Sequence, residues 1–220
     1  MNNTTEQVIE NKQTTSEYAY IRLRNMIESG ELKPGMRLIH RELAKRLDTS
    51  NIPIILAISR LEHDGLVVSV PNHGAQVVDW TYEEMECAIL IRSHLEQMAA
   101  KCCAERASEE QRTKIKDLAS KYKDYSIANN VAGCLETDDA LHTLVVKCSG
   151  IDLLIRMLNN SRVITNTIRN ICWLSTDVSR SDIHDGLVEA IVTGDQELAK
   201  AKAKEHIDDL LAKFVSRCKR

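Results

Sequence analysis

From Asp79 to the end of the chain, apolar residues recur at the three- and four-residue spacing of amphipathic helices. Residues that favour helix starts and ends divide this stretch, namely Thr81, Ser108, Ser149-Gly150 and Gly194-Asp195. The composition agrees, because 3 prolines, 8 glycines and 4% aromatic residues in 220 favour helices over sheets. The pattern therefore predicts a mainly α protein with a C-terminal antiparallel bundle of six helices over residues 80–220.

In the first third of the chain, the spacing of apolar residues predicts shorter helices. Residues 16–29 carry apolar positions at helical spacing and are followed by Gly30. His40–Leu47 and Asn51–His63 predict two short helices across a tight turn, and Ser50 is placed to cap the second of them. This order predicts an N-terminal helix-turn-helix.

A hairpin is predicted directly after these helices. Leu66–Val70 and Ala75–Val78 are typical of two short strands, joined by the turn residues Pro71–Gly74. A helix-turn-helix followed by such a hairpin is a winged helix-turn-helix, which we expect over residues 16–79. Residues 1–15 are polar and rich in Asn, Thr, Gln and Glu, so we expect a mobile tail there.

A set of short motifs recurs in order across the predicted winged helix. They are Gly30-Glu31-Leu32-Lys33-Pro34-Gly35, Arg41-Glu42-Leu43-Ala44, Ser50-x-x-Pro53, Leu61-Glu62-x-x-Gly65-Leu66-Val67 and His73-Gly74. This set resembles the winged helix of the GntR superfamily of bacterial transcription factors. The resemblance implies a dimer that reads operator DNA, with the third helix in the major groove and the wing on the neighbouring minor groove. The positions that match its DNA-facing surface are Arg41, Ser50, Asn51, His73 and Gly74.

The third helix departs from the family pattern at three positions. Asn51 and Ile55 stand where the family usually has arginine, and Leu56 stands where an acidic residue is usual. Arginine can bind guanine through two hydrogen bonds, whereas isoleucine can contact only a thymine methyl and asparagine can read an adenine edge. Residues 16–76 carry eight basic against seven acidic side chains, a net charge of +1 that gives little attraction to phosphate. We therefore expect a DNA-binding surface whose affinity is weakened or whose base preference is changed.

Four residues of the predicted bundle can share one metal ion. Asp138 and His142 are four residues apart, so they point the same way from one helix. His184 and His206 lie in two further predicted helices, 181–192 and one that starts at Gln196, and bundles build core metal sites from such inward ligands. One carboxylate and three imidazoles suit zinc, nickel or manganese. Each residue alone also has an ordinary explanation, as a core histidine, a polar residue at a helix start or a surface ion pair.

The motifs around these residues resemble a particular branch of the same superfamily. They are Arg92-x-x-Leu95-Glu96, Asp138-x-x-Leu141-His142, Ala190-Ile191-x-x-Gly194-Asp195 and the spacing of 22 residues from His184 to His206. Together they resemble the FadR/VanR branch, whose all-helical FCD domain senses a ligand. In its metal-containing members the matching aspartate and histidines bind the ion, and a small organic acid completes the coordination. The resemblance implies that Arg92 grips the carboxylate of this effector, although Arg92 can equally pair with Glu96 one helical turn away.

The resemblance therefore implies a ligand-responsive regulator and not an enzyme, with double-stranded DNA, a small organic acid and a second copy of the chain as partners. Two other classes stay open from the residues. An interaction protein with weakened DNA binding would present Ile55 and Leu56 to a protein partner. A metal-dependent enzyme could use the same four ligands to activate water, but no general base is evident beside them.

Compartment and redox state follow from what the chain lacks. No apolar run approaches the roughly 18 to 20 residues of a membrane span, and the polar start lacks the apolar segment of a signal peptide, so we expect a cytoplasmic protein. Its 7 cysteines include no C-x-x-C pair, which argues against a disulfide framework or a zinc knuckle. Most should be small buried hydrophobic residues. Cys134 differs, because it lies one turn before Asp138 and could approach the ion.

Overall fold

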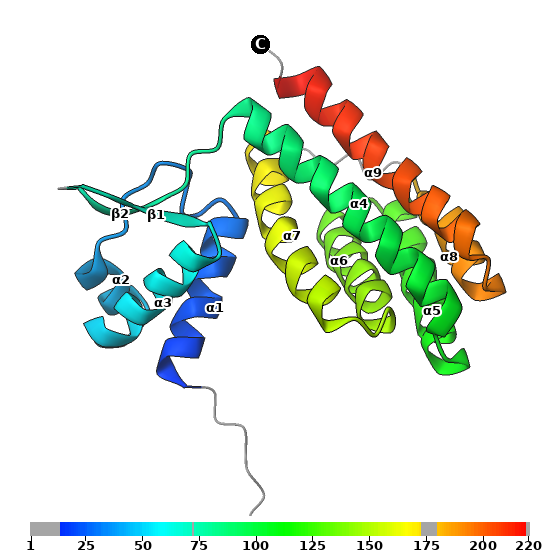
Figure 1. The fold of residues 1–220 in the computed structure, drawn as a ribbon, viewed down its shortest axis with the longest axis horizontal. Coiled ribbons are helices and arrows are strands. Elements are labelled where there is room, and N and C mark those ends of the chain that lie inside the picture. Colours follow the sequence, from blue (N-terminus) through cyan, green and yellow to red (C-terminus); the bar gives the residue numbers. More distant parts are fainter. Residues whose placement is uncertain (1–13, 72, 173–179, 219–220) are drawn as a thin grey trace, which may run out of the picture. The chain divides into compact units, whose positions relative to one another are not determined.

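The computed structural model describes residues 14–71, 73–172 and 180–218 (Figure 1). The chain divides into two compact units, Met1–Asp79 and Trp80–Arg220. The expected mobile tail lies outside the described residues except for positions 14 and 15. Among the described residues, no helix combines the length and the apolar character that crossing a membrane requires.

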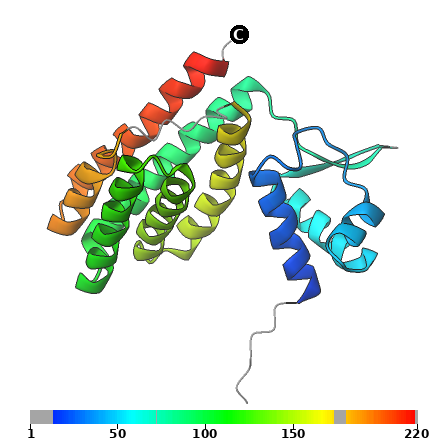
Figure 2. The same cartoon turned by 180° about the vertical axis from the view of Figure 1, so that it is seen from behind.

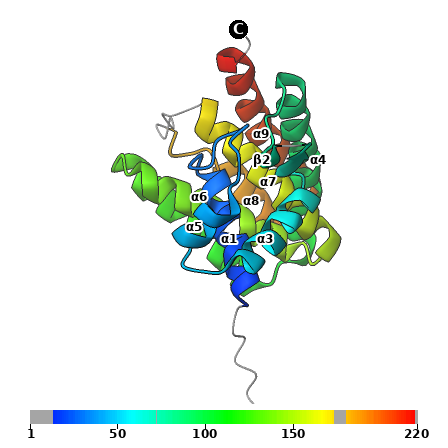
Figure 3. The same ribbon diagram turned by 90° about the vertical axis from the view of Figure 1, so that its left-hand side faces the viewer.

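The first unit has the predicted winged helix-turn-helix order. Its elements are α1 (Thr15–Glu28), α2 (His40–Arg46), α3 (Asn51–His63), β1 (Val67–Val70) and β2 (Gly74–Val77). Helices α1 and α3 lie side by side (Figure 3). Their inward residues Leu23, Ile27, Ile54 and Leu61 are fully buried and form the core of this unit. Burial of such aliphatic side chains typically contributes about 1.5 to 3 kcal/mol each.

Local hydrogen bonds set the ends of these helices. Helix α1 starts at Thr15 because the Thr14 hydroxyl accepts the Glu17 amide at 3.2 Å. Ser50 occupies the N-cap position of α3 but makes no capping hydrogen bond through its side chain, so the expected capping by its hydroxyl is wrong. Ser50 is instead exposed to solvent beside the start of α3.

The wing is an antiparallel pair with the register Val67↔Val77 to Val70↔Gly74. Gly74 has a φ of +77°, a left-handed conformation that glycine adopts without strain at the end of this tight turn. The segment before α2 lies along the other edge of β2, where the Leu38 amide donates to the Ala75 carbonyl at 2.8 Å. This pairing of the segment before α2 with β2 holds the hairpin in place beside the helices.

The second unit contains the six predicted helices. They are α4 (Tyr82–Arg106), α5 (Glu109–Ile127), α6 (Val131–Cys148), α7 (Asp152–Cys172), α8 (Asp185–Thr193) and α9 (Gln196–Cys218). Helix α4 packs against α9, α7, α6 and α8, whereas α5 packs against α6 (Figures 1 and 2). Thr81 and Ser108 each form a capping box with the residue three positions on, as their spacing predicts.

The bundle core is largely aliphatic. One cluster includes Ala100, Cys103, Ile115 and Ile191, so this cysteine acts as a small hydrophobic residue. Among these apolar layers lies a set of buried polar side chains that has no counterpart among the described residues of the first unit: Arg92, Ser93, Glu96, Gln97, Ser126, Thr137, His142, Ser149, Ser161, Arg162, Thr165, Asn166, Thr167 and His184. Buried polar groups need partners, and several of these converge on one place.

Candidate metal centre

Four potential metal ligands meet inside the bundle. Asp138 and His142 project from α6, His206 from α9, and His184 from the turn that precedes α8. Each offers one ligand atom, and these atoms all lie within 4.8 Å of one another. The structure therefore brings together all four residues that the sequence proposes as ligands.

His184 is not inside a helix, and the expectation of a helix over 181–192 is wrong at its start. Residues 181–184 form turns, α8 begins at Asp185, and His184 is its N-cap residue. The Asp185 amide bonds to the carbonyl of Asp182, three residues back, which is a tighter turn than an α-helix. This turn brings the His184 ring against the cluster.

Three distances between the ligand atoms are compatible with a single small ion. His184 Nε2 lies 3.0 Å from Asp138 Oδ1, and His142 Nε2 lies 3.1 Å from His206 Nε2 and 3.7 Å from Asp138 Oδ1. Ligands about 2.1 Å from an ion are roughly 3 Å apart at right angles and about 3.4 Å apart in a tetrahedron. The three measured separations are close to the spacing of ligands around one ion.

A chain of buried polar contacts orients His142. Its Nδ1 lies 3.0 Å from Glu96 Oε2, and Arg92 Nε donates to Glu96 Oε1 at 2.7 Å. His142 therefore donates to Glu96 through Nδ1, which leaves Nε2 directed into the cluster. The sequence predicts Glu96 only as a partner of Arg92. Helical spacing reveals that local pair but not the contact with His142 on another helix.

Electrostatics keep the cluster ready to bind a cation. Burial raises the pKa of Glu96, but the Arg92 guanidinium and His142 outweigh it and hold this pKa well below its usual range. Burial likewise opposes ionisation of Asp138, yet the His184 hydrogen bond and the surrounding imidazoles hold its pKa well below the ordinary value. Burial, together with the neighbouring histidines, lowers the pKa of His206 to about 3, so this ring is neutral. The charge of Glu96 is balanced by Arg92, so the Asp138 carboxylate and the neutral His206 ring are the groups that favour a bound positive charge.

Two further features belong to the His184 side of the cluster. The Tyr122 ring meets the His184 ring edge-on, with centroids 4.6 Å apart. His184 Nδ1 is buried and has no hydrogen-bond partner among the described residues. Cys134, which the sequence places within reach of the ion, instead directs its thiol to the Tyr122 carbonyl at 3.9 Å, and burial raises the pKa of this thiol.

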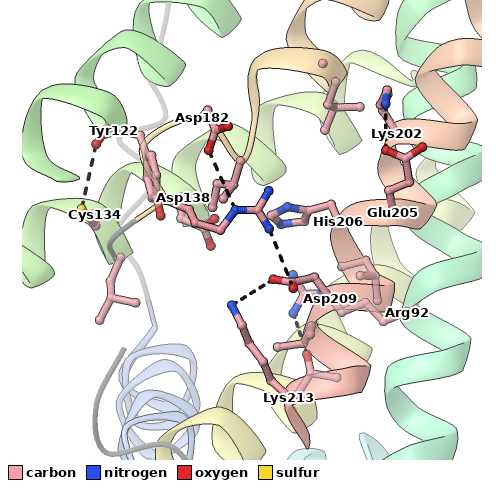
Figure 4. Close-up of a pocket in the computed structure, with 18 residues that line it drawn as sticks. Arg92, Tyr122, Cys134, Asp138, Asp182, Lys202, Glu205, His206, Asp209 and Lys213 are labelled. Atoms are coloured by element: carbon pink, nitrogen blue, oxygen red, sulfur yellow. Dashed lines mark hydrogen bonds and ion pairs between the residues drawn. The ribbon is translucent and has the colours of Figure 1, made fainter. Parts of the chain in front are cut away.

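A cavity of about 300 Å³ borders the cluster (Figure 4). Asp138 and His206 line it, so two of the four ligands face its interior. Charged residues also line it and pair with one another: Arg180 with Asp182 and Asp209, Lys213 with Asp209, and Lys202 with Glu205. This volume is at the small end of the range for ligand sites and suits a small polar molecule.

Arg92, the expected effector contact, also lines this cavity. Its side chain is buried, donates from Nη1 to Thr165 Oγ1 at 2.9 Å, and pairs with Glu96. The alternative pairing with Glu96 is therefore present. Burial alone would lower the Arg92 pKa, but the Glu96 carboxylate raises it overall, so a positive charge stays beside the cavity.

The residues expected to face DNA all lie exposed on the first unit. They are Arg41 on α2, Ser50 and Asn51 at the start of α3, and His73 and Gly74 at the wing turn. The sequence pattern does not single out Arg37, yet its guanidinium lies beside the wing, 3.9 Å from where a Cβ on Gly74 would be. Proximity of this arginine to the wing depends on the pairing of residues 36–38 with β2, which no local pattern predicts.

Both units match families of known proteins. Residues 15–77 match the family of bacterial regulatory proteins called gntR, and residues 88–209, more than half of the chain, match the FCD domain. An uncharacterized HTH-type transcriptional regulator, YdhC of Bacillus subtilis, is 35% identical over 94 residues, which span 43% of this chain and 42% of that protein. The Nta operon transcriptional regulator of Aminobacter aminovorans is 24% identical over 196 residues, 84% of this chain and 90% of that protein.

Solved structures show the same architecture. McbR/YncC of E. coli has a TM-score of 0.82 at 18% identity and covers 93% of this chain and 99% of its own. A GntR regulator of Rhodococcus has a TM-score of 0.69, also at 18% identity, and covers 92% and 97%. At this identity the likeness establishes the fold. With both domain matches in the expected order, the chain belongs to the GntR family of bacterial regulatory proteins, as a DNA-binding transcriptional regulator with a C-terminal FCD domain.

Proposed function

We propose that this regulator holds one divalent transition metal at Asp138, His142, His184 and His206, and that a small organic acid bound beside the metal controls its binding to operator DNA. The observation that carries the proposal is the convergence of four ligand atoms within 4.8 Å at the wall of a polar cavity. A bound ion would supply a Lewis-acidic site for a carboxylate oxygen. Zinc, nickel and manganese all accept this mixture of nitrogen and oxygen ligands.

The cavity favours a small anionic effector. The positive charge of Arg92 is fixed at its wall by Glu96 and Thr165, so this guanidinium can attract a carboxylate without rearranging. The other cations that line the cavity are, like Arg92, paired with carboxylates, and Lys213 lies 2.9 Å from Asp209. An effector carboxylate can compete for these cations, which links its binding to the arrangement of α9. Coupling between two sites on a protein is typically worth about 1 to 3 kcal/mol.

The proposal includes a homodimer, as the family resemblance implies. Large apolar side chains lie exposed on two helices of the bundle that pack against each other, α4 and α7. They are Leu90, Ile91, Met98, Leu153 and Met157. Monomeric proteins seldom expose many such residues on adjoining elements, which supports a second copy of the chain as their partner.

Elemental analysis tests the metal site. We expect the purified protein to contain about one transition-metal ion per chain, and the variant Asp138→Ala/His142→Ala to contain none, because it loses two of four ligands. His94→Ala is the matched control, since His94 is exposed and outside the cluster. Equal metal content in both variants would remove these residues from the site.

The Glu96→Gln variant tests whether Glu96 holds the His142 ring in the orientation that binds the metal. The substituted amide is close to the carboxylate in size but carries no charge, so the ring loses its charged acceptor and Arg92 loses its ion-pair partner. Loss of such a supporting contact typically weakens metal binding about 10- to 100-fold. Competition with a chelating dye measures this affinity, and Glu105→Gln, at an exposed glutamate on the same helix, is the control. Unchanged affinity would show that Glu96 does not act through His142.

Thermal unfolding with small carboxylates tests the effector site. Acetate, lactate, succinate and citrate are compared with the corresponding alcohols or amides, and at least one acid should raise the melting temperature of the metal-loaded protein. A ligand at about a hundred times its Kd stabilises by about 2.7 kcal/mol. The shift should be absent in Asp138→Ala/His142→Ala, and the same shift in that variant would place the acid elsewhere.

The mass of the full chain in solution tests the dimer. We expect the mass of two chains, and the variant Ile91→Asp/Met157→Asp should shift the equilibrium towards one chain because it buries charge in the interface. Ile127→Asp is the control, since Ile127 is an exposed apolar residue on α5. A monomer at all concentrations, or equal effects of both substitutions, would contradict the proposed interface.

A further inference from the structure

Helix α3 has an apolar stripe on its solvent side. Ile52, Ile55 and Leu56 are 69%, 47% and 55% exposed. Their spacing of three and four residues places them on one face of the helix. The opposite face is complete without them, because Ile54, Ala57, Ile58 and Leu61 are buried in the core of the unit. The stripe is therefore not needed to build the winged helix.

The position of the stripe points to DNA. Helix α3 is the second helix of the helix-turn-helix, and such a helix enters the major groove with its N-terminal residues against the base edges. The stripe lies in the N-terminal half of α3, next to Ser50 and Asn51, which are also exposed. It is thus continuous with the surface on which a member of this family contacts DNA.

The same helix lacks the usual means of reading guanine. Arg60 is the only lysine or arginine in α3. It forms an ion pair with Glu17 and its guanidinium lies 3.7 Å from the centre of the Tyr20 ring, so it is held against α1. Within α3, no cationic side chain is therefore placed at the helix start to bind a guanine edge.

An apolar side chain in the major groove has one apolar partner on the base edges, the 5-methyl group of thymine. Asparagine can form two hydrogen bonds with the adenine edge. We infer that α3 selects A·T-rich operator half-sites, with Ile52, Ile55 and Leu56 packing on thymine methyl groups and Asn51 reading adenine. This inference rests on the proposed control of operator DNA, and it names the base chemistry that the operator must present.

Charge complementarity supports DNA over a protein as the occupant. Arg41 and Lys45 lie exposed on α2, which packs against α3 within the helix-turn-helix. A duplex can contact such cations through its phosphates while its methyl groups contact the stripe. An apolar protein partner would leave these cations without anionic counterparts.

The test begins with selection of binding sites from a random duplex library by the full-length chain at low salt. In the selected site, each deoxythymidine is then replaced by deoxyuridine, which removes only the methyl group. Loss of one contacted methyl should weaken binding about fourfold. Replacements outside the half-sites should have no effect, and this difference distinguishes groove contacts from a general change in the duplex.

The variant Ile52→Ala/Ile55→Ala/Leu56→Ala removes the whole stripe and makes the test specific to it. All three positions are exposed, so the fold should keep its melting temperature. We expect this variant to bind the thymine and uracil forms of the site equally, whereas Ile21→Ala, at an exposed apolar residue of α1, should keep the fourfold preference.

Three results would overturn the inference, and they are distinguishable. A selected site that binds equally well with uracil, or a thymine preference that persists in the triple variant, would remove the stripe from base reading but leave operator binding in place. Enrichment of no duplex at low salt would reject operator binding itself, and the stripe would then belong to a partner other than DNA.

Discussion

The candidate site depends on one carboxylate buried between a guanidinium and an imidazole. Glu96 is nearly inaccessible, and a charge taken out of water in this way costs several kcal/mol unless other groups replace its hydration. Arg92 at 2.7 Å and His142 at 3.0 Å provide that replacement. A compensated buried pair adds little net stability, but removal of one member leaves an unpaired charge. The contact therefore acts mainly on geometry: it fixes the ring of His142 on α6 by means of a side chain on α4.

The other ligands tie further segments to the same point. His206 brings in α9, and His184 brings in the turn before α8, where its ring is also held by the edge-on contact with Tyr122 on α5. Helix α6, the turn before α8 and helix α9 thus meet at the place where the four ligand atoms converge. His184 Nδ1 is buried without a partner among the described residues, so one ring nitrogen of the cluster is not satisfied by the surrounding side chains. The 3.1 Å contact between His142 Nε2 and His206 Nε2 can be a hydrogen bond, and an ion bound by both nitrogens would replace it.

The sequence predicts this architecture unevenly, for physical reasons. The helices can be predicted from the periodicity of their apolar residues. The capping boxes at Thr81 and Ser108 can be predicted as well, because their hydrogen bonds join residues only three positions apart. The Asp138–His142 pair is also local. The approach of His184 and His206 is a tertiary contact, and only the family order of motifs indicates it.

Two predictions about helix starts are wrong. Ser50 lies at an N-cap without capping, and the segment before α8 forms a tight turn where helical spacing predicts a helix. The contact of Glu96 with His142 could not be predicted in the same way, because this second partner lies on another helix.

The inferred base contacts of α3 would make a weakly basic DNA-binding unit selective. With a net charge of only +1 over residues 16–76, phosphate attraction can supply a small share of its affinity. Contacts to base edges must then contribute relatively more, and the apolar stripe of α3 is the surface available for them. Because such contacts are short-ranged, they require close fit in the groove and are lost with small displacements. A coupling of about 1 to 3 kcal/mol between effector and DNA changes affinity roughly 5- to 150-fold. For a reader with little electrostatic attraction to hold it on DNA in either state, that change is enough to separate bound from free.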